Sequence, residues 1–209
     1  MATYIIVAII AYLIGSINFS VILSKKMAGF DVREKGSGNA GTTNMLRTVG
    51  KKGAAITLVL DVLKGVIAIF LAKLIGIIWK DLDGALLVQL AGILVVVGHT
   101  FPIFFKFKGG KGVATSLGVL LTLNWQIGLI CLVFALVLIV LTQMVSLGSI
   151  AAAILYPVLT IFIGQNYIVP GSYIISSIVL AVIVVFNHRE NVKRLLSGTE
   201  NKISFKNAK

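Results

Sequence analysis

Long apolar stretches alternate with short polar segments along the whole chain. A helix needs about 20 consecutive apolar residues to cross a bilayer, with a range of roughly 17–25. A further apolar segment, 112–123, has only 12 residues, so its status decides how often the chain crosses. The pattern predicts an all-α polytopic membrane protein. Its clear candidates for membrane-spanning helices are 3–23, 54–79, 84–105, 127–142, 146–164 and 171–187.

The composition agrees with this pattern. Hydrophobic residues make up 58% of the 209 residues, and the mean hydropathy is +1.03, whereas soluble domains are roughly 45–50% apolar. The length fits one compact bundle, so residues 1–209 are expected to form a single integral-membrane domain. No basic residue precedes the first apolar run, which favours a retained first helix over a cleavable signal peptide.

Positive charge gathers in three segments of the chain, whose net charge is +12. Basic residues are enriched in the cytoplasmic loops of membrane proteins, so all three segments are expected on the cytoplasmic side. This placement explains the charge without a nucleic acid, and the expected partner surface is the lipid bilayer. The basic residues of these segments are Lys25, Lys26, Arg33, Lys35, Arg47, Lys51 and Lys52, then Lys106, Lys108 and Lys111, and finally Arg189, Lys193, Arg194, Lys202, Lys206 and Lys209.

The short segment 112–123 must cross the membrane if the three basic segments share the cytoplasmic side. The prediction is then a seven-transmembrane-helix bundle with one short helix, its N-terminus outside and its C-terminus cytoplasmic. In the alternative, 112–142 forms one bent span or a re-entrant segment, and the chain crosses five or six times. The outside turns of the seven-helix prediction are Lys80–Asp83, Asn124–Gln126 and Gln165–Gly171, which are nearly free of basic charge.

The first polar segment, GSGNAGTTNMLR from Gly36 to Arg47, has the composition of an anion-binding loop. Its glycines let backbone N–H groups approach a ligand, its hydroxyls and amides supply neutral hydrogen bonds, and the Arg47 guanidinium matches a phosphate bidentately. A short helix starting near Thr42 would add free N–H groups. The alternative is a flexible polar loop beside lipid headgroups. The candidate binding residues are Gly36, Ser37, Gly38, Asn39, Thr43, Asn44 and Arg47.

The second polar segment, GHTFPIFFKFKGGKGVAT from Gly98 to Thr115, contains glycines flanked by lysines at a helix start. Such a combination is typical of an anion-binding site. It is not a Walker A sequence, because Lys111 is followed by Gly112 and no glycine stands five residues before that lysine. The alternative is a basic turn against anionic lipid. The candidate residues are Lys108, Gly109, Gly110, Lys111 and Gly112.

Both histidines of the chain lie beside polar segments. His99 stands near the inner end of 84–105, and His188 opens the segment HRENVKRL, which also contains Asn191. Neither histidine is followed five residues later by an aspartate, so the His–Asp dyad of the soluble-type glycerolipid acyltransferases is absent. Each histidine is therefore either part of a site or a structural residue.

Four further polar residues lie within or at the start of predicted spans. Asp61 and Lys64 share one face of 54–79, and because unpaired charges are costly there, they predict a structural ion pair. A carboxylate metal site lacks ligands, and neither a metal nor another cofactor is expected. Ser146 and Ser149 share a face at the start of 146–164, where they either cap the helix or contact a substrate.

Four motifs together resemble a known family: GSGNAGTTNMLR, GHTFPIFFKFKGGKGVAT, SLGSI and HRENVKRLLSGTE. They are similar to the signature segments of the PlsY family, the bacterial integral-membrane glycerol-3-phosphate acyltransferases that use acyl phosphate. The match covers nearly the whole chain in order and spacing. The resemblance implies a seven-helix fold in the bacterial cell membrane with its motifs on the cytoplasmic side.

The resemblance also implies an activity. Acyl phosphate would donate its acyl group to the 1-position hydroxyl of glycerol 3-phosphate, giving lysophosphatidic acid and inorganic phosphate, the first step of bacterial phospholipid synthesis. A soluble enzyme that forms acyl phosphate is then an expected partner. The site residues that the resemblance implies are Ser37, Asn39, Asn44, Arg47, Lys108, Gly110, Lys111, Ser146, His188 and Asn191.

As a mechanism, Arg47 and Lys111 are expected to hold phosphates, and the glycine amides of 36–41 and 109–112 to stabilise developing charge. The proton of the attacking hydroxyl passes either to a substrate phosphate or to His188, and Ser37 completes the expected catalytic set. A membrane transporter of phosphorylated metabolites is the alternative function. It would require substrate-binding groups near the middle of the bilayer, whereas the candidate groups here collect at one face.

Overall fold

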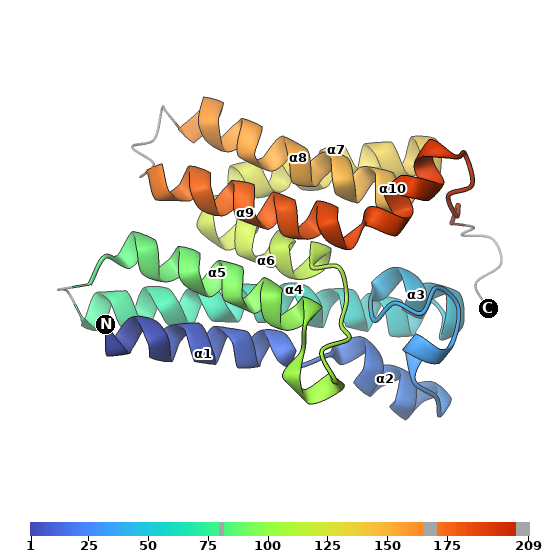
Figure 1. Cartoon of the computed structure of the whole chain (residues 1–209), viewed down its shortest axis with the longest axis horizontal. Helices are drawn as coiled ribbons and strands as arrows, with labels where there is room; N and C mark the ends of the chain where they lie inside the picture. Colours follow the sequence, from blue (N-terminus) through green and yellow to red (C-terminus); the bar gives the residue numbers. More distant parts are fainter. Residues whose placement is uncertain (80–81, 165–170, 204–209) are drawn as a thin grey trace.

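The computed structural model describes residues 1–79, 82–164 and 171–203, and within these ranges it is helical without any β-strand (Figure 1). Most helices begin and end within a few residues of the predicted spans, and a short helix does begin at Thr42. The helices are α1 (Ala2–Ser16), α2 (Phe19–Ala28), α3 (Thr42–Thr48), α4 (Lys51–Ile78), α5 (Gly84–Thr100), α6 (Val113–Leu123), α7 (Trp125–Thr142), α8 (Val145–Gly164), α9 (Gly171–Asn187) and α10 (Arg189–Leu196), with 3-10 turns η1 (Val32–Glu34) and η2 (Ile103–Phe105).

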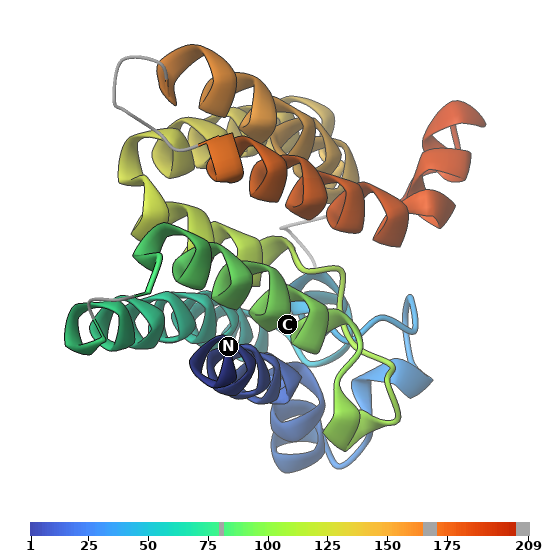
Figure 2. The same ribbon diagram turned by 60° about the vertical axis from the view of Figure 1, so that its left-hand side comes forward.

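The long helices lie roughly along one direction, with α6 between two groups (Figures 1 and 2). In one group α1 packs on α5 and α4 on α5, and in the other α7 packs on α8 and α8 on α9. Their shared core contains Ile69, Leu87, Val95 and Val119, none of which is exposed. Many large apolar side chains, such as Phe162 at 71% exposure, cover the outside of the bundle, as expected for a protein that faces lipid.

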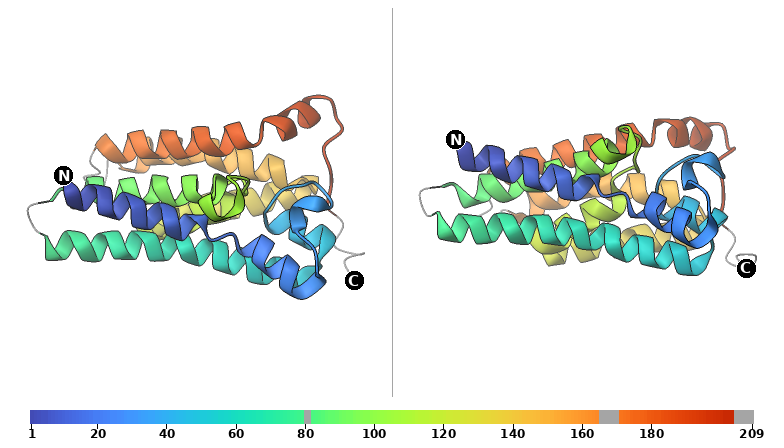
Figure 3. Two further views of the ribbon diagram at one scale, coloured as in Figure 1. Left: turned by 60° about the horizontal axis from the view of Figure 1, so that its bottom comes forward. Right: turned by 90° about the horizontal axis from the view of Figure 1, so that it is seen from below.

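The lengths and compositions of the described helices provide five candidate membrane spans, or six if the pair Tyr173–Asn187 and Arg189–Leu196, bent by 63°, is one span. The 11-residue α6 falls below the length of a full crossing. The first residues and the tail segment 199–203 lie at opposite ends of the bundle (Figure 3). The protein is therefore a multi-pass membrane protein, while the seven crossings and the orientation stay predictions. The predicted outside turns Lys80–Asp83 and Gln165–Gly171 fall in part outside the described residues.

The short α6 packs against α4 through two glycines. A Cβ on Gly118 would lie 2.1 Å from the Val62 carbonyl oxygen, and one on Gly65 would lie 2.4 Å from the Thr115 carbonyl oxygen. Small residues at such positions let helix backbones approach closely in a membrane. The contact holds α6 inside the bundle and fixes where the loop before it, 101–112, must end.

The first predicted span, 3–23, lies within one candidate span, but it is broken into two helices and is not one continuous helix. The helix stops at Ser16, and the Asn18 side chain accepts hydrogen bonds from Val21 N at 3.2 Å and from Ser20 Oγ at 2.7 Å, which starts α2 afresh. An asparagine side chain competes in this way with the helical backbone. Both pieces together still form one candidate span, Ala2–Ala28.

The predicted ion pair inside the membrane is confirmed. Lys64 Nζ lies 3.0 Å from Asp61 Oδ1, and both side chains are at most 3% exposed. Lys64 also donates to the carbonyl oxygens of Gly15 at 3.0 Å and Ile17 at 2.9 Å. The lysine thereby satisfies carbonyls left without partners at the end of α1, because a helix end exposes its last carbonyls.

Candidate functional site

The predicted polar segments meet at one end of the bundle, opposite the N-terminus (Figure 3). The loop 29–41 with α3, the loop 101–112, the start of α8 and α10 with its following tail all lie there. Segments far apart in the sequence thus surround one region, as the charge pattern predicted.

Asn44 is the centre of the first loop. Its Nδ2 donates to the carbonyl oxygens of Val32 at 2.8 Å, Lys35 at 3.0 Å and Asn39 at 3.0 Å, while its Oδ1 accepts from Ser37 N at 2.9 Å. The side chain is buried, and an amide has only two N–H donors, so its donors are fully engaged. This geometry differs from the predicted substrate contact, because Asn44 holds the loop instead.

The segment of this loop around Ser37 is open to solvent. Gly36 and Gly38 have φ angles of 62° and 71°, a left-handed backbone that favours glycine. Ser37 and both glycines are exposed, whereas Asn39 and Thr43 are half-buried. Arg47 lies in the last turn of α3 and is exposed. The loop therefore presents the Ser37 hydroxyl and the Arg47 guanidinium outward from a backbone fixed by Asn44.

Two amides of the second loop are already paired. Gly109 N donates to the Thr100 carbonyl oxygen at 3.0 Å, and Gly110 N donates to the His99 carbonyl oxygen at 3.1 Å. The expectation that these two N–H groups stabilise developing charge was therefore wrong. They fasten the loop to the end of α5 instead, while Gly112, with φ of 89°, turns the chain into α6.

Arg33 joins the two loops and was missed as a site residue by the sequence analysis. Its Nη1 donates to the carbonyl oxygens of Phe105 at 2.8 Å and Lys108 at 3.0 Å. The guanidinium also contacts Asp31 through Nε at 3.0 Å and Nη2 at 2.8 Å. This hydrogen-bonded partner lowers the pKa of the Asp31 carboxyl from its usual value. The Lys108 side chain is exposed, so the loop holds Lys108 through its backbone.

A chain of side chains links the second loop to the tail. Lys111 Nζ donates to Asn191 Oδ1, Asn191 Nδ2 donates to Glu200 Oε1 at 2.8 Å, and Arg194 Nε donates to Glu200 Oε2 at 2.9 Å. Glu200 was also missed, although an acid that follows a basic segment is a sequence signal for such a pairing. Its side chain is 3% exposed.

The charges of this cluster shift one another's pKa values. Burial lowers the pKa of Lys111 to about 8, with Glu200 opposing the shift and Arg194 and Arg47 adding to it. Burial alone would raise the pKa of Glu200, but hydrogen bonds from Asn191, the nearby Ser146 hydroxyl and Arg194 outweigh it and lower the pKa. Lys111 is therefore a cation poised to lose its proton slightly above neutral pH.

His188 lies at the junction of α9 and α10 and is 3% exposed. Its Nδ1 donates to the Val184 carbonyl oxygen at 2.7 Å, since a carbonyl can only accept. Burial and the nearby Lys111 ammonium lower the pKa of His188 to about 4. The imidazole is thus neutral near pH 7, and its Nε2 is left as a hydrogen-bond acceptor.

The two serines at the start of α8 differ in their surroundings. Ser146 is buried, and its hydroxyl lies near Glu200, where it stabilises the ionised carboxylate and lowers the pKa. The contact between the two side chains does not have the geometry of a hydrogen bond. Ser149 Oγ donates to the Val145 carbonyl oxygen at 2.9 Å within its own helix. Ser149 also lines an apolar pocket, so only Ser146 belongs to the charged cluster.

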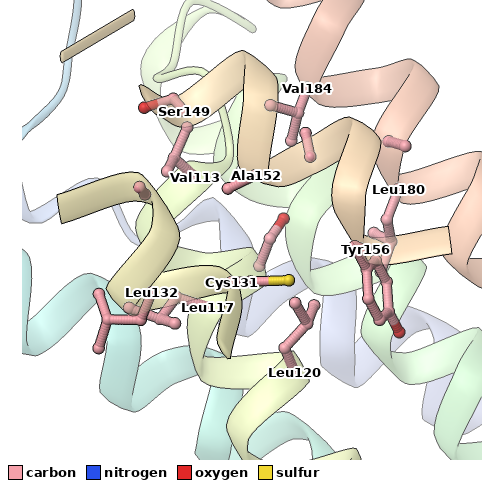
Figure 4. Close-up of a pocket in the computed structure, with 14 residues that line it drawn as sticks. Val113, Leu117, Leu120, Cys131, Leu132, Ser149, Ala152, Tyr156, Leu180 and Val184 are labelled. Carbon is pink, nitrogen blue, oxygen red and sulfur yellow. The ribbon is translucent and has the colours of Figure 1, made fainter. Parts of the chain in front are cut away.

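That apolar pocket is shown in Figure 4. It is partly open, has a cavity volume of about 90 Å³ and lies between α6, α7, α8 and α9. Val113, which directly follows Gly112, and Val184, whose carbonyl holds His188, line it at the end near the cluster. Cys131 and Tyr156 line its deeper part (Figure 4). A charged end and an apolar interior thus lie side by side.

The structure brings Arg47, Lys111, His188, Asn191 and Ser146 into one electrostatic cluster and adds Arg194 and Glu200 to it. Lys108 and Ser37 lie at the surface around it. In the described ranges, no three residues among the histidines, cysteines and acids are grouped to hold a metal ion. A helical bundle with several apolar spans defines an integral membrane protein, here with a cationic cluster at one end of its helices.

The chain belongs to the glycerol-3-phosphate acyltransferase family, whose model matches residues 5–198. It is 46% identical over 208 residues to the glycerol-3-phosphate acyltransferase of Clostridioides difficile (strain 630), covering 98% of this chain and 97% of that one. It is 49% identical over 203 residues to that of Thermoanaerobacter pseudethanolicus, covering 97% and 96%. The family resemblance inferred from the motifs is thereby confirmed.

Two crystal structures have the same fold. Both are of PlsY, an integral membrane glycerol 3-phosphate acyltransferase. The glycerol 3-phosphate form has a TM-score of 0.86 at 36% identity, and the lysophosphatidic acid form a TM-score of 0.84 at 34% identity. Each comparison covers 97% of this chain and 96% of the other. These relatives support the assignment of this chain as a glycerol-3-phosphate acyltransferase.

Proposed function

We propose that this protein transfers the acyl group of an acyl phosphate to the 1-position hydroxyl of glycerol 3-phosphate, giving lysophosphatidic acid and inorganic phosphate. The main observation that supports this proposal is the cationic cluster around Lys111, which lies directly beside an apolar pocket. An acyl phosphate has this same division into an anionic head and an apolar chain. The reaction takes place at the cytoplasmic face of the bacterial cell membrane, with acyl phosphate supplied by a soluble enzyme.

The apolar pocket is assigned to the acyl chain of the donor. Its α6 wall runs from Val113 to Leu120, about 10 Å at 1.5 Å per residue, so it holds the first part of a long chain. Lining by apolar side chains favours a hydrocarbon through burial of its surface. The reacting carbonyl is then at the charged end of the pocket, close to Gly112 and His188.

The phosphates are assigned to Arg47 and Lys111, with Lys108, Asn39 and Thr43 at the rim. A guanidinium binds a phosphate bidentately, whereas an ammonium acts as a compact charge. Since the pKa of Lys111 is about 8, this side chain is mostly protonated near pH 7. The exposed Gly36, Ser37 and Gly38 line the same region, and Asn44 acts by holding them in place.

In the reaction, the 1-hydroxyl oxygen bonds to the acyl carbon as the bond from that carbon to the phosphate oxygen breaks. Inorganic phosphate leaves with the bonding electrons, and the cations around Lys111 stabilise the charge that builds up on it. The hydroxyl proton passes to a phosphate oxygen, because a phosphate with a second pKa near 6 is a better base than His188 with a pKa of about 4. The 1-hydroxyl has only one hydrogen, which goes to the phosphate, so the neutral His188 positions glycerol 3-phosphate by accepting a hydrogen bond from its 2-hydroxyl at Nε2.

Purified protein in detergent tests this proposal when it is given acyl phosphate and glycerol 3-phosphate. Phosphate release should require both substrates and yield lysophosphatidic acid. R47A and K111A should each lose most turnover, while R189A, at an exposed position of α10, should keep it. Near-normal turnover of R47A and K111A would remove them from the site. Uptake of glycerol 3-phosphate into proteoliposomes without acyl transfer would favour a transporter.

A further inference from the structure

His99 lies between the ion pair inside the membrane and the second loop. Its ring is 4% exposed, and its Nδ1 lies 3.6 Å from Asp61 Oδ1. Within the described part of the chain neither of these two atoms makes a well-formed hydrogen bond. Lys64 Nζ forms its ion pair with the same Asp61 oxygen at 3.0 Å. A small movement of the ring towards this oxygen would therefore make a buried hydrogen bond.

The opposite edge of the His99 ring faces Gly110 of the second loop, and the His99 backbone faces Gly109. A Cβ on Gly110 would lie 2.2 Å from His99 Nε2, 2.8 Å from Cε1 and 2.8 Å from the Ala40 carbonyl oxygen. A Cβ on Gly109 would lie 2.0 Å from the His99 carbonyl oxygen. The loop backbone is thus packed between His99 and the first loop, and there is no space for a side chain.

Lys111 directly follows this packed segment, and its ammonium reaches Asn191. We infer that His99, anchored by Asp61, is a positioning residue for ligand binding, because it supports Gly109 and Gly110 and thereby sets where Lys111 can hold a phosphate. The inference rests on the proposed function in one respect, that the Lys111 cluster binds the phosphate of glycerol 3-phosphate. His99 is buried beneath the loop, so it acts through Gly110 and not on the substrate.

The wild-type protein allows a direct test, because the chain has only two histidines. Labelling histidine Cε1 with carbon-13 gives two resonances, and H188Q assigns them by the loss of one. Glycerol 3-phosphate is then titrated in, with glycerol as the uncharged control. Both resonances should shift with the same midpoint, since Cε1 of His99 is itself beside Gly110.

The possible outcomes separate the two proposals. If the His188 resonance shifts and the His99 resonance stays, the inference is wrong while the phosphate site stands. If neither shifts, the assignment of the phosphate site is itself wrong. Equal shifts with glycerol would show that charge recognition is not involved, and this would also overturn the inference.

Variants provide a second test. H99F keeps the ring but removes both nitrogens, and it should raise the KM for glycerol 3-phosphate about tenfold with less than a threefold change in kcat. D61L/K64M removes the anchor without leaving a lone charge and should do the same. K73M is the matched control, because Lys73 Nζ donates to the Thr122 carbonyl oxygen at the far end of α6. It should lower thermal stability but leave KM unchanged.

A purely structural role predicts a different pattern. H99F would then resemble K73M, with lower thermal stability and an unchanged KM, and this result would overturn the inference. If H99F fails to fold, the resonance of His99 in the wild-type protein decides the question.

Discussion

The titration of Lys111 gives the sharpest prediction, because its ammonium is the central cation of the proposed site. Burial lowers its pKa from 10.5 to about 8, a shift that disfavours the cation by about 3 kcal/mol at 1.36 kcal/mol per unit. A group with a pKa of about 8 is roughly 90% protonated at pH 7 and roughly 10% at pH 9. Phosphate binding that needs the cation should therefore weaken as the pH rises through 8.

The measurement is kcat/KM for glycerol 3-phosphate between pH 6.5 and pH 9.5, with saturating acyl phosphate at constant ionic strength. We expect an alkaline decline of about tenfold per pH unit above 8. K111R keeps the charge at all these pH values, so any activity that it retains should lack this decline. E200Q removes the carboxylate that raises the pKa of Lys111, so the decline should begin at lower pH. A flat wild-type profile up to pH 9.5 would refute this reasoning.

Three further perturbations test the framework around the cluster. R33A removes charged donors from two carbonyls and leaves Asp31 with only the more distant Lys25 ammonium, at 3.7 Å, so it should cost about 2 kcal/mol and lower the midpoint of thermal unfolding; an unchanged midpoint would contradict the inter-loop role. A152F fills the apolar pocket and should reduce kcat/KM for hexadecanoyl phosphate at least tenfold relative to octanoyl phosphate, whereas V182F on the outer surface of α9 should not. N44A leaves three loop carbonyls without their donor and should retain less than a tenth of the wild-type kcat/KM; half-normal activity would argue against the holding role.

The helices could be predicted well because an apolar run in a membrane has few alternatives to a helix. Even the short α6 was placed within a residue of its bounds, from 112–123 to Val113–Leu123. The break at Ser16 escaped prediction because it depends on one side chain, Asn18, which can also be tolerated in a continuous helix. The number of membrane crossings also stays a prediction. It is odd or even depending on whether the 11-residue α6 crosses the membrane.

The residue types in the sequence identified the candidate segments. They did not show which side chains in those segments are free to bind a ligand and which hold the loop in place. Asn44 has the chemistry of a ligand contact, and only the folded loop shows that neighbouring carbonyls use its amide. The link from Arg33 to Phe105 and Lys108 was not predictable, because its acceptors are backbone carbonyls and every residue has one. Glycine amides at 109 and 110 looked available for the same reason, since the sequence does not show that the end of α5 accepts their hydrogen bonds.

The placement of charge also bears on the choice between an enzyme and a transporter. A transporter would hold its substrate near the middle of the bilayer with groups reachable from both sides. The two lysines of α4 that lie beyond its first turn are instead engaged. Lys64 contacts Asp61 and two carbonyls, and Lys73 donates to the Thr122 carbonyl. The cations that remain for an anionic ligand gather at one end, where they adjoin a pocket suited to hydrocarbon. That arrangement matches a reaction in which the head of an amphipathic donor stays at the membrane surface while its chain remains in the apolar interior.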